Sequence, residues 1–177
     1  MDLNDWLTIA VPTIISIIGF VVTFVSLSKS FKNELNKQRM GVHIDKMSTI
    51  PYDILKLLDT MVQTGNQNQE ITIQEINNLL NNIYAYGSEK AIQLAALMQK
   101  ENYRNAKKPE SMNRYKVMSL YILLATQIKY DVTGITISPE FWFQMRIKDY
   151  ENNKEHFKTE TNQLIKKLQL EDDFLIK

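Results

Sequence analysis

The chain has 177 residues, no cysteine and a formal net charge of +1 at pH 7, with 21 basic and 20 acidic side chains. This length suits one folded domain with a core of its own. The absence of cysteine excludes disulfides and thiolate chemistry. The balanced charge of residues 47–177 excludes a general nucleic-acid binder, which would carry a basic excess over its folded part.

The first predicted element is a membrane-spanning helix over residues 6–28. The run WLTIAVPTIISIIGFVVTFVSLS contains no charged residue, and as a helix rising about 1.5 Å per residue it would cross roughly 30 Å of hydrocarbon. The alternative is a cleaved signal peptide, which has a basic start, an apolar stretch of about 7–15 residues and small residues at the cleavage site. Residues 1–5 are acidic, and Val25, Leu27 and Phe31 crowd the only candidate cleavage region. The sequence therefore predicts a retained membrane anchor.

The charge changes across this span. No Lys or Arg precedes it, whereas residues 29–47 form a basic juxtamembrane stalk that would meet anionic lipid headgroups. The residues expected to contact headgroups are Lys29, Lys32, Lys37 and Arg39. The positive-inside rule places residues 1–5 outside and the rest of the chain in the cytoplasm. The predicted localisation is the cell membrane, with a single pass.

Small or weakly polar residues recur along the span at spacings of three and four, which places them on one helix face. They are Pro12, Ser16, Gly19, Thr23, Ser26 and Ser30. Because membrane helices associate where small residues allow close backbone approach, this stripe predicts a homo-oligomer held together by the span. The alternative is that the hydroxyls bond back to the carbonyl four residues earlier in the same helix.

Residues 48–177 carry helical patterns, and the predicted fold class is all-α, with a bundle-like helical cytoplasmic domain behind the transmembrane helix. The stalk is expected to prolong the span as a helix and to fray at Gly41. Pro51 opens a helix with apolar residues at helical spacing, which ends at a polar loop beginning at Thr64.

Thr72 and Glu75 form a T-x-x-E capping box for the next helix, which ends at Gly87. Ser88 is the predicted N-cap of the helix that follows. The apolar face expected for that helix consists of Ile92, Ala95, Ala96, Gln99 and Tyr103, with Leu94 and Met98 beside it.

Residues 115–130 are the most hydrophobic stretch behind the anchor, but they are too short and too polar for a second span. They are interpreted as a buried central helix. Ser138, Pro139 and Glu140 then open another helix. The final segment, which suits docking onto the bundle or pairing with a second copy, places apolar residues at heptad-like spacing: Phe157, Leu164, Leu168 and Leu175.

The sequence carries no recognisable catalytic, cofactor-binding or metal-binding signature. His43 and His156 have no second nitrogen or sulfur ligand at helical spacing. No G-x-S-x-G elbow and no Gly-rich phosphate loop is present. The stretches YAYGSEKA and QIKYDVTG have the look of motifs, but no activity attaches to them.

The densest cluster of unusual residues joins residues 127–131 to residues 141–150, where aromatic residues, Met and Arg are grouped in a composition typical of interface hot spots. The candidate partner-binding residues are Trp142, Phe143, Arg146 and Tyr150. The same composition suits the edge of a core, in which the aromatic rings pack and Arg146 pairs with Asp131 or Asp149.

These patterns together predict a membrane-anchored helical interaction or scaffold protein, by analogy of the type that mobile elements use for immunity or exclusion. Its expected partners are anionic lipids, a second copy and an unidentified protein, with no cofactor and no nucleic acid. One alternative is a membrane-active, pore-forming oligomer, and another is a membrane-tethered enzyme without a recognisable motif. Abundant Asn, Lys and Ile indicate a bacterial or phage origin.

Overall fold

The computed structural model describes the backbone of residues 3–63 and 73–177, and the side chains of residues 19–38, 40–61 and 74–177. Every regular element in these ranges is a helix, which confirms the all-α class. The chain divides into two compact units, Met1–Val42 and His43–Lys177. The helices are α1 (Leu3–Met47), α2 (Ile50–Gln63), α3 (Ile73–Tyr86), α4 (Glu89–Lys107), η1 (Pro109–Ser111), α5 (Arg114–Thr133), α6 (Glu140–Arg146), α7 (Tyr150–Leu168) and η2 (Asp172–Phe174).

Helix α1 is 45 residues long and makes up the first unit almost entirely. It runs through Gly41 without a break, so the fraying predicted there is wrong. A glycine inside a helix costs only about 1 kcal/mol, which the turns on either side can offset. Among the residues whose side chains are described, no helix is both long and apolar enough to cross a membrane. The side chains of residues 6–18, the first part of the predicted span, are not among those that the structure describes.

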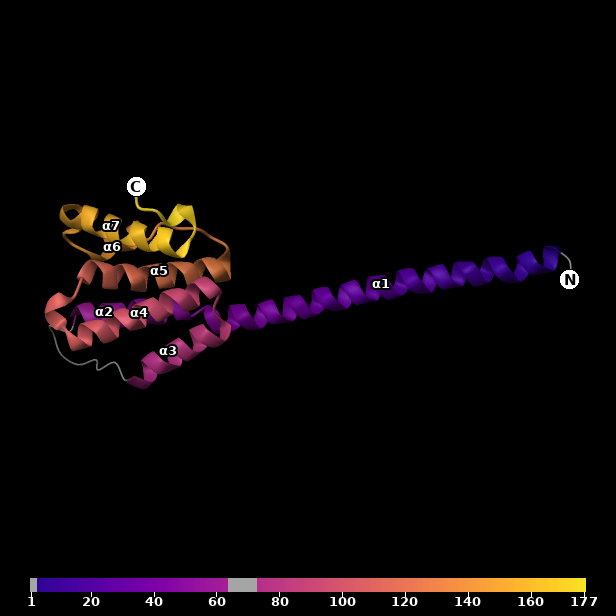
Figure 1. Ribbon diagram of the computed structural model, residues 1–177, viewed down its shortest axis with the longest axis horizontal. Helices are drawn as coiled ribbons and strands as arrows, with labels where there is room; N and C mark the ends of the chain where they lie inside the picture. Colours follow the sequence, from indigo (N-terminus) through magenta and orange to yellow (C-terminus); the bar gives the residue numbers. More distant parts are fainter. Residues whose placement is uncertain (1–2, 64–72) are drawn as a thin grey trace. The chain divides into compact units, whose positions relative to one another are not determined.

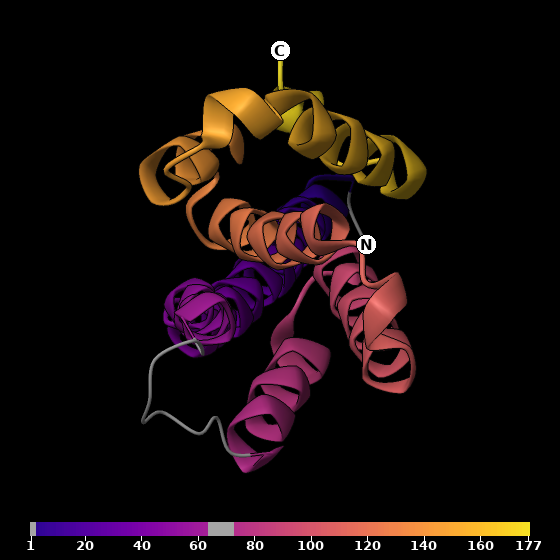
Figure 2. The same ribbon diagram turned by 90° about the vertical axis from the view of Figure 1, so that its left-hand side faces the viewer.

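The second unit is a layered bundle built around α5. This helix contacts α2, α4 and α7, and it is buried on all sides from Ser119 to Ile128. In Figures 1 and 2, α5 lies between a layer of α6 and α7 and a layer of α2 and α4, with α3 beyond the second layer. A helix that is hydrophobic all round belongs in a core, so the buried central helix predicted over residues 115–130 is confirmed.

The start of α4 follows the prediction, but its buried face does not. Ser88 Oγ accepts a hydrogen bond from the Ala91 N–H at 3.2 Å, which confirms Ser88 as the N-cap. The residues that α4 buries are Ala91, Leu94, Ala95, Met98 and Glu101, whereas Ala96 and Tyr103 are exposed. The true face lies one residue, or about 100°, from the predicted one. Thr72 of the predicted capping box lies outside the described residues.

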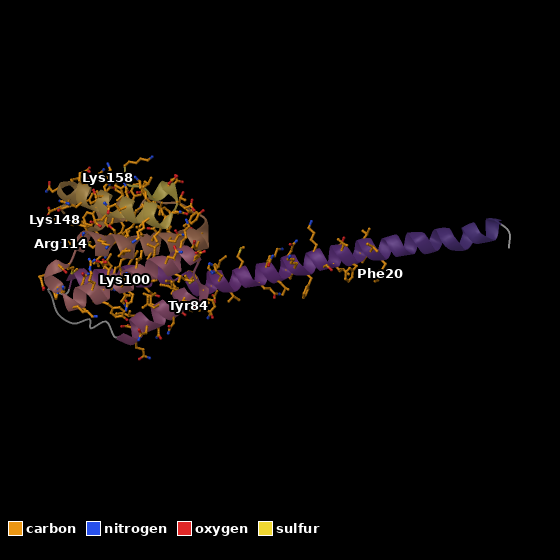
Figure 3. The ribbon with its side chains drawn as sticks, in the orientation of Figure 1. Phe20, Tyr84, Lys100, Arg114, Lys148 and Lys158 are labelled. Carbon is orange, nitrogen blue, oxygen red and sulfur yellow. The ribbon has the colours of Figure 1, made fainter. Side chains whose placement is uncertain are left out.

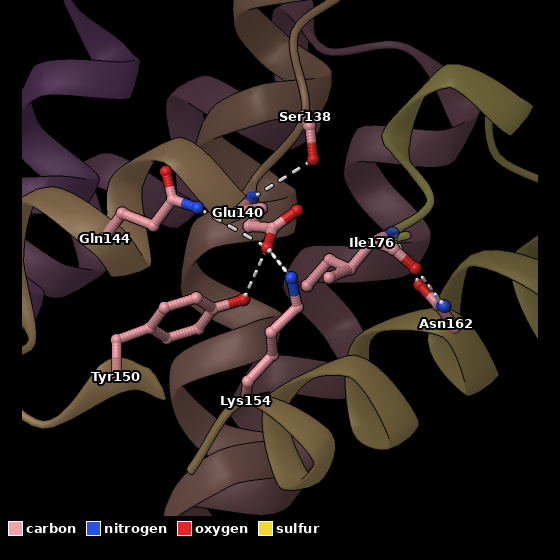
Figure 4. Close-up of polar contacts among 7 residues, drawn as sticks. All are labelled: Ser138, Glu140, Gln144, Tyr150, Lys154, Asn162 and Ile176. Atoms are coloured by element: carbon pink, nitrogen blue, oxygen red, sulfur yellow. Dashed lines mark hydrogen bonds and ion pairs between the residues drawn. The ribbon is translucent and has the colours of Figure 1, made fainter. Parts of the chain in front are cut away.

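The C-terminal segment packs onto the bundle. Helix α7 buries Phe157, Leu164 and Ile165 and ends at Leu168, and the C-cap residue Gln169 has a left-handed backbone with a φ of 51°. Because the helix stops there, the predicted heptad spacing does not continue to Leu175. The Asn162 side chain instead fixes the tail by two hydrogen bonds of 2.9 Å to the backbone of Ile176 (Figure 4).

Candidate partner-binding site

The site begins where α5 ends. Gly134 has a φ of 68°, a left-handed conformation that glycine adopts without strain, and its N–H donates to the Tyr130 carbonyl at 2.7 Å. The chain then turns back along the bundle. Ser138 Oγ accepts a hydrogen bond from the Glu140 N–H at 3.2 Å. Helix α6 begins at Glu140 with Pro139 as its N-cap, one residue later than the prediction, which made Ser138 the cap and Pro139 the first helical residue.

Helix α6 is short but anchored at several points. Phe143 is 0% exposed, and its ring lies 4.5 Å from that of Phe157, centroid to centroid. On the other side, Arg146 forms an ion pair with Asp59 of α2. A helix of this length has little stability of its own, so these tertiary contacts hold it in place.

A polar clamp joins the first turn of α6 to α7. Glu140 Oε1 accepts hydrogen bonds from the Tyr150 hydroxyl at 3.2 Å and from Lys154 Nζ at 2.8 Å (Figure 4). Burial raises the pKa of the Tyr150 phenol, and the negative charge of Glu140 raises it further. Tyr150 therefore stays protonated and donates to the carboxylate. Every group in this clamp is already paired, so the cluster has a structural role.

An apolar pocket of about 190 Å³ opens between α2, α5, α6 and the segment that joins α5 to α6. Helix α5 supplies one wall from positions that repeat every three or four residues, and α6 supplies the opposite wall. The lining residues are Pro51, Leu55, Ile122, Ala125, Thr126, Lys129, Ile137, Ser138, Pro139, Phe141, Trp142 and Met145. A concave apolar site with few polar groups is the usual form of a binding pocket.

Two large apolar side chains of this pocket are also exposed to solvent. Phe141 is 54% exposed and Met145 is 73% exposed, while Trp142 between them is half-buried. Single exposed apolar residues are common on protein surfaces. A group of them beside an apolar pocket is a better indication of a contact surface.

The candidate residues predicted from the sequence separate into two groups. Trp142 lines the pocket, and Arg146 lies beside it in the ion pair with Asp59. Phe143 and Tyr150 are core residues with almost no exposed surface, so they cannot contact a partner and are removed from the set. The pairing of Arg146 with Asp131 or Asp149 is likewise corrected, because its partner comes from α2.

Phe141, Met145 and Lys129 belong to the cluster that the sequence indicates, but they were not among the four candidate partner-binding residues. The signal that could have selected the two α6 residues is helical phase: once Phe143 points inward, positions two residues before and after it point away from the core. Lys129 lines the same pocket from α5, and its place beside α6 depends on the tertiary fold.

The structure describes the side chains of only part of the predicted association stripe on α1. Pro12 and Ser16 lie outside the described side chains, while Gly19, Ser26 and Ser30 are exposed. Thr23 Oγ1 donates to the Gly19 carbonyl at 2.8 Å, as the alternative interpretation expects. Association through the stripe stays a prediction.

The residues predicted to meet headgroups lie on the same helix. Lys29, Lys32 and Lys37 are exposed, and the side chain of Arg39 lies outside the described part. Figure 3 shows Phe20 on the surface of α1. Contact with headgroups stays a prediction.

The two motif-like stretches meet in the fold. Ser88, at the start of α4, donates to Asp131 Oδ2 at 2.6 Å, and Gln127 Nε2 donates to Asp131 Oδ1 at 2.8 Å. These contacts tie α4 to the end of α5. The serine donates to a carboxylate and has no histidine beside it in the described contacts, so the joint lacks the base that a nucleophile needs.

A buried carboxylate joins α4 to α5 elsewhere. Glu101 is buried and pairs with Lys116 Nζ at 3.1 Å and with Arg104. Neutralised in this way, the charge has a structural role. Within the described residues, no group of three or more His, Asp or Glu side chains could hold a metal ion.

Comparison with known proteins adds no assignment. The chain matches no protein-family model, no curated protein and no solved structure. The pocket between α2, α5 and α6, called the α6 pocket below, is therefore the main guide to function.

Proposed function

We propose that this chain is a single-pass membrane protein whose helical unit, residues 43–177, binds a partner protein in the cytoplasm through the α6 pocket. The proposal has two parts, a membrane anchor and a binding surface. Each part is supported by a different set of residues.

The anchor is supported by the sequence of residues 6–28 and by exposed side chains on α1. Phe20 is 73% exposed and Phe31 is 67% exposed, and the large apolar residues between them are exposed as well. Water is a poor environment for a continuous set of such side chains. Lipid would cover those within the uncharged run, and the Lys residues that follow it favour a cytoplasmic C-terminal side.

The binding surface is supported by one observation above the others. Helix α6 is fixed by Phe143 and by the Arg146–Asp59 ion pair, yet it exposes Phe141 and Met145 beside an open apolar pocket. A rigid helix that presents apolar side chains next to a pocket has the form of an interface centre.

Site-specific photo-cross-linking in the full chain tests this function. A photoreactive residue at Met145 should form a discrete adduct with another protein in membranes of the native host. The same residue at Tyr84, which is exposed on α3 far from the pocket in sequence, is the control and should not form that adduct. Equal labelling from both positions, or none from Met145, would contradict the binding surface. Release of the chain from membranes by an alkaline wash would contradict the anchor.

A further inference from the structure

The α6 pocket contains one charged side chain, that of Lys129. None of the residues that line the pocket is acidic, and no carboxylate of the described chain lies within ion-pair distance of Lys129. The nearby Arg146 is already paired with Asp59. The pocket therefore joins an apolar surface to one uncompensated positive charge.

The volume of the pocket limits what can enter it. Sites for drug-sized ligands and cofactors have volumes of about 300–1,000 Å³, whereas an apolar cavity of about 150 Å³ accepts benzene. At about 190 Å³, the α6 pocket fits one aromatic ring or one branched side chain. A larger molecule would extend out of the pocket into the surrounding solvent.

The exposed residues around the pocket distinguish a protein segment from a free small molecule. A ligand that filled only the pocket would leave the outer parts of Phe141 and Met145 in water. A protein segment would cover them and exclude water around the inserted side chain, as happens around interface hot spots.

We infer that the partner presents one large apolar side chain to the α6 pocket and, in the same segment, a carboxylate that pairs with Lys129. This inference rests on the proposed function, because it specifies the chemistry of the partner that the same pocket binds. Apolar contact supplies the affinity, and the ion pair supplies selection against basic or neutral segments.

Three small probes with the same ring and chain length test this chemistry: 3-phenylpropionate, 3-phenylpropanol and 3-phenylpropylamine. Binding is measured by Trp142 fluorescence in the full chain in nanodiscs, with Trp6→Phe removing the other tryptophan. The acid should bind about two- to fivefold more tightly than the alcohol, the range of a partly exposed ion pair, and the amine should bind most weakly. A dissociation constant near 1 mM is expected, because each probe supplies only part of the interface.

The variant Lys129→Met should bind all three probes alike, because the apolar lining is kept and the charge is removed. The matched control is Lys148→Met, an exposed lysine outside the pocket, which should keep the preference for the acid (Figure 3). Equal binding of the three probes by the parent chain would overturn the inference. So would a preference that persists in Lys129→Met.

The outcomes also separate this inference from the proposed function. Cross-linking from Met145 without a preference for the acid would leave the binding surface standing and overturn the carboxylate. A dissociation constant below about 10 µM for 3-phenylpropionate would show that the pocket alone binds a small molecule tightly. That result would overturn a protein segment as the occupant of the pocket.

Discussion

Two phenylalanines of α6, only two positions apart, have opposite environments. Phe143 has no exposed surface and packs against Phe157, whereas Phe141 is more than half exposed at the rim of the α6 pocket. The same residue type therefore serves the core at one position and a contact surface at the other. Their substitutions should separate stability from binding.

Phe143→Ala should lower the free energy of unfolding by about 3–5 kcal/mol, the usual loss for a buried Phe. That loss is a large share of the roughly 5–15 kcal/mol available to a domain. Phe141→Ala should change it by less than about 1 kcal/mol, while reducing cross-linking from Met145. Urea unfolding of the full chain in detergent measures both variants. Equal losses would mean that Phe141 also belongs to the core.

For single residues, the sequence predicted the structural role where that role depends only on neighbouring residues, as it does for helix caps. Ser88 was predicted as an N-cap, because that position has a strong residue preference. The separation of Phe143 from Trp142 was not predictable from composition, because the phase of α6 depends on its packing against α7. The Arg146–Asp59 pair joins positions far apart in the chain, which no local pattern indicates.

At the scale of elements, the boundary between the two units falls inside a helix. The sequence places it after residue 47, where the stalk was expected to end. In the structure the last turn of α1 belongs to the second unit, and Met47 is fully buried in that unit's core. A helix boundary and a domain boundary therefore do not coincide.

A fragment of residues 43–177 should fold on its own and be more stable than a fragment of residues 48–177. Loss of Met47 should cost up to about 2–5 kcal/mol, as for truncation of a buried Met; fraying of the short N-terminal turn would reduce the difference. Thermal unfolding followed by circular dichroism measures both fragments. The control is Met47→Ala in the longer fragment, which should unfold like the shorter one. If that variant keeps the stability of its parent, Met47 is not a core residue.

The elements as a group were more predictable than the faces they bury. Periodicity and caps indicated the helices at α2, α3, α4 and α5, because these signals are local. The buried face of α4 was displaced by one residue. Its alanines and Leu94 allow two neighbouring apolar faces, and only contact with α5 decides between them.

At the scale of the whole molecule, the distribution of charge supports different roles for the two units, with the first as the proposed anchor and the second as the proposed binding unit. All basic residues follow the uncharged run, and those nearest to it are the lysines of the stalk. The second unit has a hydrophobic core of its own, which among the described side chains is built from residues between Met47 and Ile176. The first unit is a single helix with exposed apolar side chains, so its stability in water is low unless lipid or another chain covers them.

Charges placed within the uncharged run should therefore release the chain from the membrane, whereas the same charges placed just beyond it should not. An Asp at the centre of a span costs about 2.5–3.5 kcal/mol, and less toward its ends, so Phe20→Asp with Phe24→Asp offsets the contributions of several apolar residues at roughly 0.3–0.6 kcal/mol each. The matched control is Phe31→Asp with Leu35→Asp, which has the same spacing and lies among the stalk lysines. Flotation of the full chain with lipid vesicles is the measurement, and the parent and the control should float while the inner variant stays at the bottom. Flotation of all three would place the membrane contact outside residues 20–24, and failure of the parent to float would rule out the anchor.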